Sequence, residues 1–303
     1  ENDGVPEIEY KRIKVDEKGV IWFMPTEVLN HAIVKNSNRK WTAIKFEQSV
    51  FNKINALNSI EVRYINRSPE LLISSVVGGL FKYFNGFWTN ISQKNGLLSD
   101  TLTNVKMCGD KILIANLKGL SIINSKNKIE NFSLVSKFRD SRLLGISSCE
   151  ENNFSKHSRI LLGINWIAIF DGEQITKISD KFNLSYSGLN DQISVNFVNK
   201  EKIIFGSTST LYIYSFVSKK LDKLILDTPT SDRGATSIFK DYEGNIWISS
   251  LRGIYKLTII PFENYSKKTG LLEDEVCLVS CFNSGLKIFG HNYGITFETK
   301  ASY

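Results

Sequence analysis

A motif with the pattern Asp-x-x-Gly-x-x-Trp occurs twice in this chain, once near each end. Its positions are Asp16, Gly19 and Trp22, and then Asp241, Gly244 and Trp247. Six residues after the second tryptophan comes a Gly-Ile pair at Gly253, and degenerate copies of this arrangement lie between the two motifs and beyond the second. The glycine slot falls at Glu27, Gly79, Gly119, Trp166, Thr210, Gly253 and Gly294. Seven copies spaced by about 44 residues indicate a repeat architecture.

Each copy reads as a series of short strands. In the third copy we expect strands at 105–108, 111–115, 120–123 and 129–132, with turns between them. Repeats of 40–50 residues with four antiparallel strands each predict an all-β fold, a seven-bladed β-propeller, in a single domain over 1–303. The seventh copy has room for three strands only. We therefore expect either a fragment of a longer multi-domain protein or a three-stranded last blade.

The connections between copies carry a second motif. It reads Asn95-Gly-Leu-Leu-Ser-Asp100 before the third copy and Thr269-Gly-Leu-Leu-Glu-Asp274 before the seventh. Together with the first motif, it resembles the two-component regulator propeller repeat. The second, third, sixth and seventh copies match that pattern, whereas Glu27, Trp166 and Thr210 replace its glycine in the others.

The resemblance implies a function for the whole chain. Such repeats typically form the periplasmic part of hybrid two-component sensor histidine kinases of Bacteroidetes. They imply a carbohydrate or other nutrient-derived ligand, a homodimer that relays the signal, and a membrane attachment through segments outside this chain. The domain itself is then not an enzyme, although the full-length protein can carry a histidine kinase.

A candidate ligand surface follows from the predicted turns between second and third strands, which share one face of a propeller. They supply amides, cations and aromatic rings, a combination suited to a sugar or another small molecule. The candidates are Asn116, Lys118, Asn165, Trp166, Arg252, His291, Asn292 and Tyr293. Turns are also polar simply because they are exposed, so a purely structural role stays open for each residue.

Composition narrows the function classes. The formal net charge is +7, but Lys and Arg do not cluster, so no nucleic-acid partner is expected. Three His and four Cys at unsuitable spacings predict no metal site and no catalytic residues, and we expect no cofactor. The four Cys are expected to be buried free thiols. Two alternatives remain: a protein-interaction propeller of the cell envelope, and an enzyme similar to virginiamycin B lyase.

Overall fold

The computed structural model describes residues 9–26, 32–38, 40–47, 56–147, 158–184, 193–226, 234–250, 253–258, 265–282 and 286–298. Within these ranges the chain is all-β, as predicted, and consists of seven antiparallel sheets. Two short 3₁₀ helices, η1 (Gln93–Asn95) and η2 (Lys267–Thr269), complete the described secondary structure. Neither of these helices is long and apolar enough to cross a membrane.

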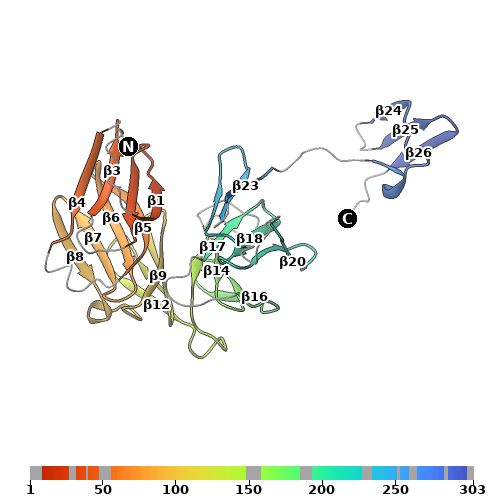
Figure 1. The fold of residues 1–303 in the computed structure, drawn as a ribbon. Coiled ribbons are helices and arrows are strands. Elements are labelled where there is room, and N and C mark those ends of the chain that lie inside the picture. Colours follow the sequence, from red (N-terminus) through yellow and green to blue (C-terminus); the bar gives the residue numbers. More distant parts are fainter. Residues whose placement is uncertain are drawn as a thin grey trace. The chain divides into compact units, whose positions relative to one another are not determined.

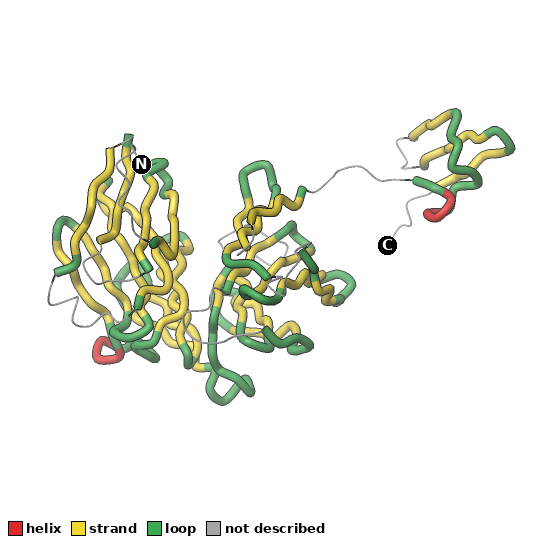
Figure 2. The backbone as a smooth tube through the Cα atoms, in the orientation of Figure 1, coloured by secondary structure: helices red, strands yellow, loops and turns green. Residues whose placement is uncertain are grey.

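The strands of every sheet follow one another in chain order, each paired with the next (Figure 2). The first sheet contains β1 (Tyr10–Val15), β2 (Ile21–Pro25), β3 (Ala32–Ser37) and β4 (Lys40–Lys45). The second contains β5 (Leu57–Ile65), β6 (Ser68–Ser75), β7 (Leu80–Phe84) and β8 (Phe87–Ile91). The third contains β9 (Leu102–Cys108), β10 (Lys111–Asn116), β11 (Gly119–Ile123) and β12 (Ile129–Ser133). The fourth contains β13 (Gly145–Ile146), β14 (Arg159–Leu162), β15 (Ile167–Phe170) and β16 (Ile175–Ser179).

The fifth sheet also has four strands, whereas the sixth and seventh have three described strands each. The fifth contains β17 (Ser194–Phe197), β18 (Lys202–Gly206), β19 (Leu211–Ser215) and β20 (Leu221–Lys223). The sixth contains β21 (Ser237–Lys240), β22 (Ile246–Ser250) and β23 (Gly253–Leu257). The seventh contains β24 (Leu278–Cys281), β25 (Lys287–His291) and β26 (Gly294–Glu298). The predicted strand positions of the third copy are thus confirmed, and the seventh copy has three strands among the described residues.

The chain forms two compact units, residues 1–258 and residues 259–303. The first unit holds the first six sheets, and the second unit holds η2 and the seventh sheet (Figure 1). The expectation of one domain over 1–303 stays a prediction.

In the first unit, the opening strands of consecutive sheets are neighbours: β1 contacts β5, β5 contacts β9, and the series continues through β13 and β17 to β21. Five hydrophobic clusters lie between consecutive sheets, from the first pair to the fifth and sixth. The core is therefore divided into layers between blades, and each blade depends on its neighbours for burial.

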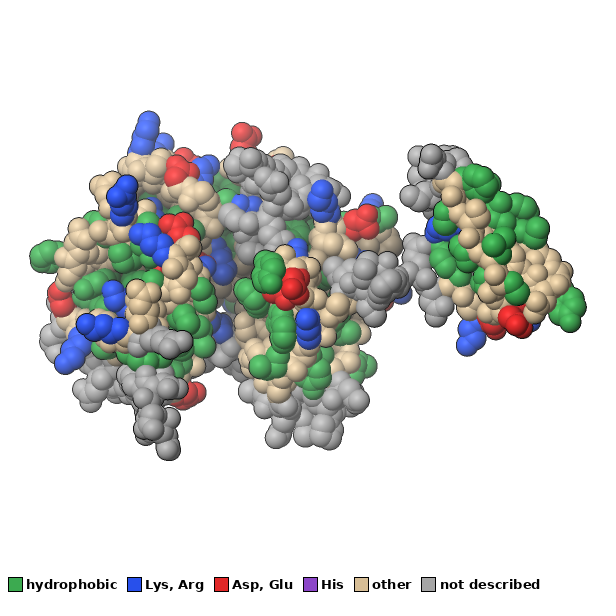
Figure 3. Space-filling view, turned by 90° about the horizontal axis from the view of Figure 1, so that it is seen from above, with side chains coloured by type: hydrophobic (Ala, Val, Ile, Leu, Met, Phe, Trp, Pro, Cys, Tyr) green, Lys and Arg blue, Asp and Glu red, His purple; other side chains and the backbone are tan. Residues whose placement is uncertain are grey.

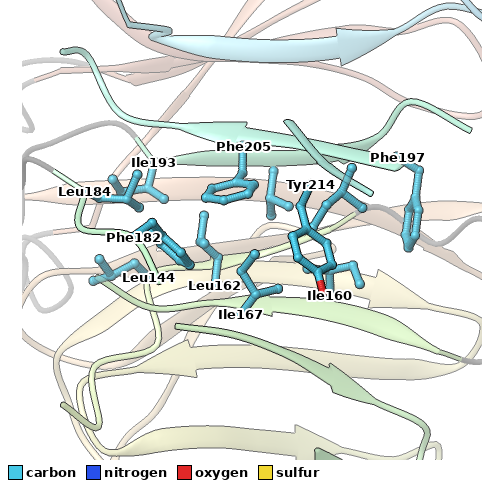
Figure 4. Close-up of a cluster of buried hydrophobic side chains, with 12 residues drawn as sticks. Leu144, Ile160, Leu162, Ile167, Phe182, Leu184, Ile193, Phe197, Phe205 and Tyr214 are labelled. Carbon is cyan, nitrogen blue, oxygen red and sulfur yellow. The ribbon is translucent and has the colours of Figure 1, made fainter. Parts of the chain in front are cut away.

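One layer shows how this packing works. Between the fourth and fifth sheets, Leu162 and Ile167 face Phe205 and Tyr214, and Phe182 from the connecting segment fills the space between them (Figure 4). Phe182 and Phe205 have ring centroids 4.9 Å apart in a tilted arrangement. Tilted aromatic pairs of this kind stabilise a core beyond the area that they bury.

The first Asp-x-x-Gly-x-x-Trp motif forms the turn between β1 and β2. The Asp16 carboxylate accepts hydrogen bonds from the backbone of Lys18 and Val20 at 2.9 and 3.0 Å, and from Trp22 Nε1 at 2.8 Å. Gly19 has a φ of +75°, in the left-handed region that favours glycine. The motif is thus a capped hairpin turn whose aspartate also fixes the tryptophan, which accounts for its recurrence.

The second motif has the same construction. Asp241 accepts hydrogen bonds from the backbone of Glu243 and Asn245 and from Trp247 Nε1, the last at 2.8 Å. Gly244 has a φ of +89°. Both aspartates thus hold the turn that follows them and fix the tryptophan of their motif.

The glycine slot marks the start of the third strand in each matching copy. β11, β23 and β26 begin at Gly119, Gly253 and Gly294, whose φ values are +141°, +141° and +159°. Gly79 directly precedes β7 and has a φ of +85°. Residues with a Cβ rarely adopt these conformations, so the slot selects glycine for backbone reasons.

Candidate functional site

Two of the predicted ligand residues are buried in the first unit. Asn116 is 0% exposed, and its Oδ1 accepts a hydrogen bond from the Lys118 backbone at 3.0 Å. Trp166 is 2% exposed, donates from Nε1 to the Asp140 carbonyl at 2.7 Å, and packs on Phe138. These contacts give both side chains a structural role within the blades, because a buried ring has no face free for a sugar. Asn116 and Trp166 are therefore left out of the candidate ligand surface.

The other predicted residues of the first unit remain accessible. Lys118 is exposed in the turn between β10 and β11, and Asn165 is half-buried in the turn between β14 and β15. Arg252 lies outside the described residues. A ligand role for these three residues stays a prediction.

In the second unit, three predicted residues share the turn between β25 and β26. His291 is held by both ring nitrogens, with Nδ1 3.0 Å from the Glu275 carbonyl and Nε2 2.9 Å from Thr296 Oγ1. Asn292 and Tyr293 are exposed, and Tyr293 is 88% exposed. Tyr293 is therefore a ring that a ligand of the second unit can reach.

The described cysteines are free thiols. Cys108 is half-buried, whereas Cys277 and Cys281 are exposed in the second unit. The expectation of burial is therefore wrong for the last two, and Cys149 lies outside the described residues. Among the described residues, no group of three or more His, Cys, Asp or Glu side chains is placed to hold a metal ion.

A cavity of about 680 Å³ lies at the opening strands of all six sheets of the first unit. It is lined by residues of β1, β5, β9, β13, β17 and β21 or of the segments next to them. This volume is in the range of small-molecule sites. On the face seen in Figure 3, Lys and Arg side chains are scattered and do not form one patch.

The charged residues of the lining come from four strands. They are Arg12 and Lys14 of β1, Glu61 of β5, Lys106 of β9 and Lys240 of β21. Among the described residues of the lining, four cations and one carboxylate sum to +3 at neutral pH.

The single carboxylate links three neighbouring strands. Glu61 lies 2.5 Å from Lys14 Nζ through Oε2 and 3.1 Å from Lys106 Nζ through Oε1. Its side chain is 4% exposed, whereas those of the two lysines are 32% and 33% exposed. The carboxylate is thus buried beneath two ammonium groups that remain open to the cavity.

The start of β1 concentrates further positive charge. Lys11 is adjacent to Arg12 and contacts Asn58 Oδ1 at 3.2 Å. Burial and, to a smaller extent, repulsion by Arg12 together lower the pKa of Lys11 to about 8. Burial also lowers the pKa of Arg12. The pairing of β1 with β2 is irregular between Tyr10 and Arg12, as at a β-bulge, and such irregularities redirect side chains.

Several neutral polar groups of the lining already have partners. Ser59 Oγ accepts a hydrogen bond from Val105 N at 2.7 Å, and Ser194 Oγ accepts one from Ile238 N at 3.1 Å. These bonds join neighbouring opening strands, so they hold the wall of the cavity together. Asn104 differs, because its Oδ1 is buried and has no hydrogen-bond partner among the described residues.

No family model matches this chain, and no curated protein matches it. Several solved structures match it in fold. The extracellular domain of BT3049 from B. thetaiotaomicron, whose name assigns it to a hybrid two-component system, is 14% identical with a TM-score of 0.55. That match covers 94% of this chain and 39% of the other. The two are similar in fold over nearly the whole of the present chain.

Two structures of the extracellular domain of BT4673 from the same organism have TM-scores of 0.60 and 0.58 at 12% and 13% identity. One is named for a one-component system and the other for a hybrid two-component system, and both matches cover 97% of this chain and 38% of that one. The WD40 β-propeller domain of Doa1 matches with a TM-score of 0.54 and 12% identity, over 80% of this chain and 76% of that one.

The seven sheets are the blades of a β-propeller. At these identities the likeness concerns the fold, and the chain spans about two fifths of the length of the B. thetaiotaomicron domains. The predicted fold class is confirmed.

Sequence analysis missed the charged cavity of the propeller. Its charged residues are distributed over four repeats, up to 228 positions apart from Arg12 to Lys240, so no local motif indicates them. A signal exists in the opening strands, where cations occur in the first, third and sixth copies. It becomes visible only when these strands are aligned with one another.

Proposed function

We propose that this chain is a ligand-sensing propeller from the extracytoplasmic part of a two-component sensor, with no catalysis of its own. The observation that carries this proposal is the likeness of fold over 94–97% of the chain to extracellular domains named for such systems. The repeat motifs point in the same direction, since they resemble the two-component regulator propeller repeat.

In this proposal a carbohydrate or other nutrient-derived ligand contacts exposed turn residues. Lys118, Asn165 and Tyr293 retain accessible side chains, and Arg252 remains a candidate. Binding changes the association of two copies of the full-length sensor, and a histidine kinase on the other side of the membrane reads that change. The domain is periplasmic, and its membrane attachment lies outside residues 1–303.

The reading frame beyond Tyr303 gives the first test. We expect a transmembrane segment followed by a histidine-kinase domain. A frame that continues into an unrelated secretion domain would contradict the sensor and favour the interaction propeller of the cell envelope.

The second test measures ligand binding and output. Thermal-shift screening against neutral oligosaccharides is expected to find a stabilising sugar, with a smaller shift for Tyr293→Ala and Arg252→Ala than for the wild type. The same sugar should change autophosphorylation of the full-length protein in membranes. Shifts equal to that of the wild type in both variants would exclude these turn residues from the binding site. Unchanged autophosphorylation would contradict the sensor function.

A further inference from the structure

We propose that the cavity at the opening strands of the first unit is a second binding site, which takes a small solute carrying carboxylate, sulfate or phosphate groups. This site is separate from the turn residues considered above. It uses charged side chains of the first unit only, and it holds whether or not the chain belongs to a sensor.

The charges of the lining favour an oxyanion. Arg12, Lys14, Lys106 and Lys240 line one cavity, and Glu61 is the only carboxylate among the described residues that line it. Each ammonium group has three N–H donors, so an ion pair with Glu61 leaves donors of Lys14 and Lys106 for a solute. Guanidinium and ammonium groups are the usual partners of carboxylate, sulfate and phosphate, since these hydrogen bonds are charge-assisted.

Folding alone does not account for these cations. Like charges that share a partly buried space repel one another, and neutral polar residues would fill the same strand positions without that cost. Lys11 already shows the repulsion, because Arg12 contributes to lowering its pKa. Lys14 and Lys106 share the carboxylate of Glu61, so one positive charge is left over among these three side chains, and a bound anion would offset it.

The cavity also limits the size of the solute. About 680 Å³ admits a small molecule and not a folded macromolecule. Asn104 Oδ1, which has no partner among the described residues, can accept a hydrogen bond from a hydroxyl group of the solute. A compact molecule with several anionic groups and a hydroxyl therefore fits the lining, and citrate is a convenient probe of this kind.

Isothermal titration calorimetry of the full 303-residue chain at pH 7 tests the proposal, with citrate, sulfate and inorganic phosphate as separate arms. Ionic strength is held constant with sodium chloride, because surface charges are screened by salt. We expect saturable binding of at least one of these anions, and the comparison of the three arms identifies the preferred group. A chain that binds none of them would overturn the proposal.

Charge-changing variants locate the site. Lys106→Gln should weaken binding about fivefold or more, the effect of one unit charge at about 4 Å even in a water-like dielectric. Glu61→Gln should strengthen binding by a similar factor, and the double variant, which restores the net charge of the lining, should bind close to the wild type. Lys111→Gln is the matched control, because Lys111 is exposed, lies outside the lining and belongs to the same β9–β10 hairpin as Lys106.

The controls separate this site from general charge effects. Equal losses in Lys106→Gln and Lys111→Gln would show nonspecific attraction and overturn the proposal. A Glu61→Gln protein that keeps its fold and binds no more tightly would overturn it as well. Should Glu61→Gln fail to fold, Lys240→Gln takes its place, with an expected loss similar to that of Lys106→Gln and an unchanged affinity as the contradicting result.

Discussion

The first and sixth blades contain the same turn motif but differ in what covers it. Trp22 and Trp247 each donate a hydrogen bond from Nε1 to the aspartate of their own motif, and each lies beneath a lysine of the adjacent third strand, Lys35 or Lys256. Yet Trp22 is 1% exposed and Trp247 is 38% exposed. The motif therefore builds the hairpin locally, and burial of its tryptophan comes from the neighbouring blade.

The second blade supplies that cover in the first case. Trp22 belongs to a cluster with Ile60, Leu71 and Phe81 of the second sheet. The Tyr64 hydroxyl, also from the second sheet, donates to the Asp16 carboxylate at 2.7 Å. A turn made by one blade is thus completed by a side chain of the next, so the two blades are stabilised together.

The largest expected difference between the two copies follows from removing each tryptophan. Trp22→Ala should lower the free energy of unfolding by about 3–5 kcal/mol, the usual cost of deleting a buried aromatic side chain. Trp247→Ala should cost no more than about 2 kcal/mol, since its ring is already partly exposed. Urea unfolding followed by circular dichroism measures both. Equal losses would show that Trp247 is as deeply buried in solution as Trp22.

The glycine slot gives a second comparison, between the third and sixth blades. Gly119 and Gly253 have the same φ of +141°, but a Cβ at Gly119 would meet the Phe132 carbonyl oxygen at 2.2 Å. A Cβ at Gly253 would have no described atom within 4 Å. The contact at Gly119 comes from β12, the fourth strand of its blade.

Gly119→Ala should therefore cost about 3 kcal/mol, from backbone strain together with overpacking against a strand. Gly253→Ala should cost about 1 kcal/mol, from backbone strain alone. Thermal unfolding of the two variants provides the measurement. A loss for Gly253→Ala as large as that for Gly119→Ala would indicate a fourth strand beside Gly253 in solution.

The repeat explains why the fold was predictable from the sequence. Asp16 and Asp241 act within their own turns, and the glycine slot is set by a local backbone angle. The aspartate and glycine positions therefore recur in the sequence at the spacing of the repeat. Strand positions could be predicted from this spacing, as β10 and β11 of the third blade show.

The candidate ligand residues were less predictable, because burial is decided by distant segments. Trp166 lies in a predicted turn, but its indole nitrogen bonds to the Asp140 carbonyl and its ring lies over Gly163. A Cβ at Gly163 would come within 2.2 Å of that ring, so the glycine makes room for it. Likewise, Lys14 and Lys106 meet at Glu61 only because three opening strands are neighbours, a relation that no single repeat encodes.

The Tyr64 hydrogen bond can be tested apart from the ring packing. Tyr64→Phe should lower the free energy of unfolding by about 1 kcal/mol, since it removes one hydrogen bond to the buried carboxylate of Asp16. Tyr242→Phe serves as the control, because Tyr242 is 97% exposed in the second copy of the turn. Removing the Tyr242 hydroxyl should change the free energy of unfolding by less than about 0.5 kcal/mol. A Tyr64→Phe protein as stable as this control would show that the two blades are not joined through Asp16.

The smallest effect concerns the protonation of the two aspartates. Burial alone would raise the pKa of Asp16, but hydrogen bonds from Trp22, Tyr64 and two backbone N–H groups lower it below the usual 3.8. Desolvation alone would likewise raise the pKa of Asp241, but hydrogen bonds from Trp247, Asn245 and the backbone lower it to about 2. Both folded-state pKa values are lowered, so each carboxylate stabilises the fold fully above about pH 4, and that contribution is lost as the pH falls toward 2.

Tyr64→Phe separates the two aspartates in this titration. The variant should raise the pKa of Asp16, because one of the donors to its charged form is gone, and should leave that of Asp241 unchanged. Carboxyl-carbon NMR between pH 5 and pH 2 follows both groups in one sample. If the pKa of Asp16 did not move, the hydroxyl of the second blade would not stabilise the turn of the first. The burial of Trp22 and the contacts of Lys18 with Tyr64 and Arg67 would then link the two blades at this turn.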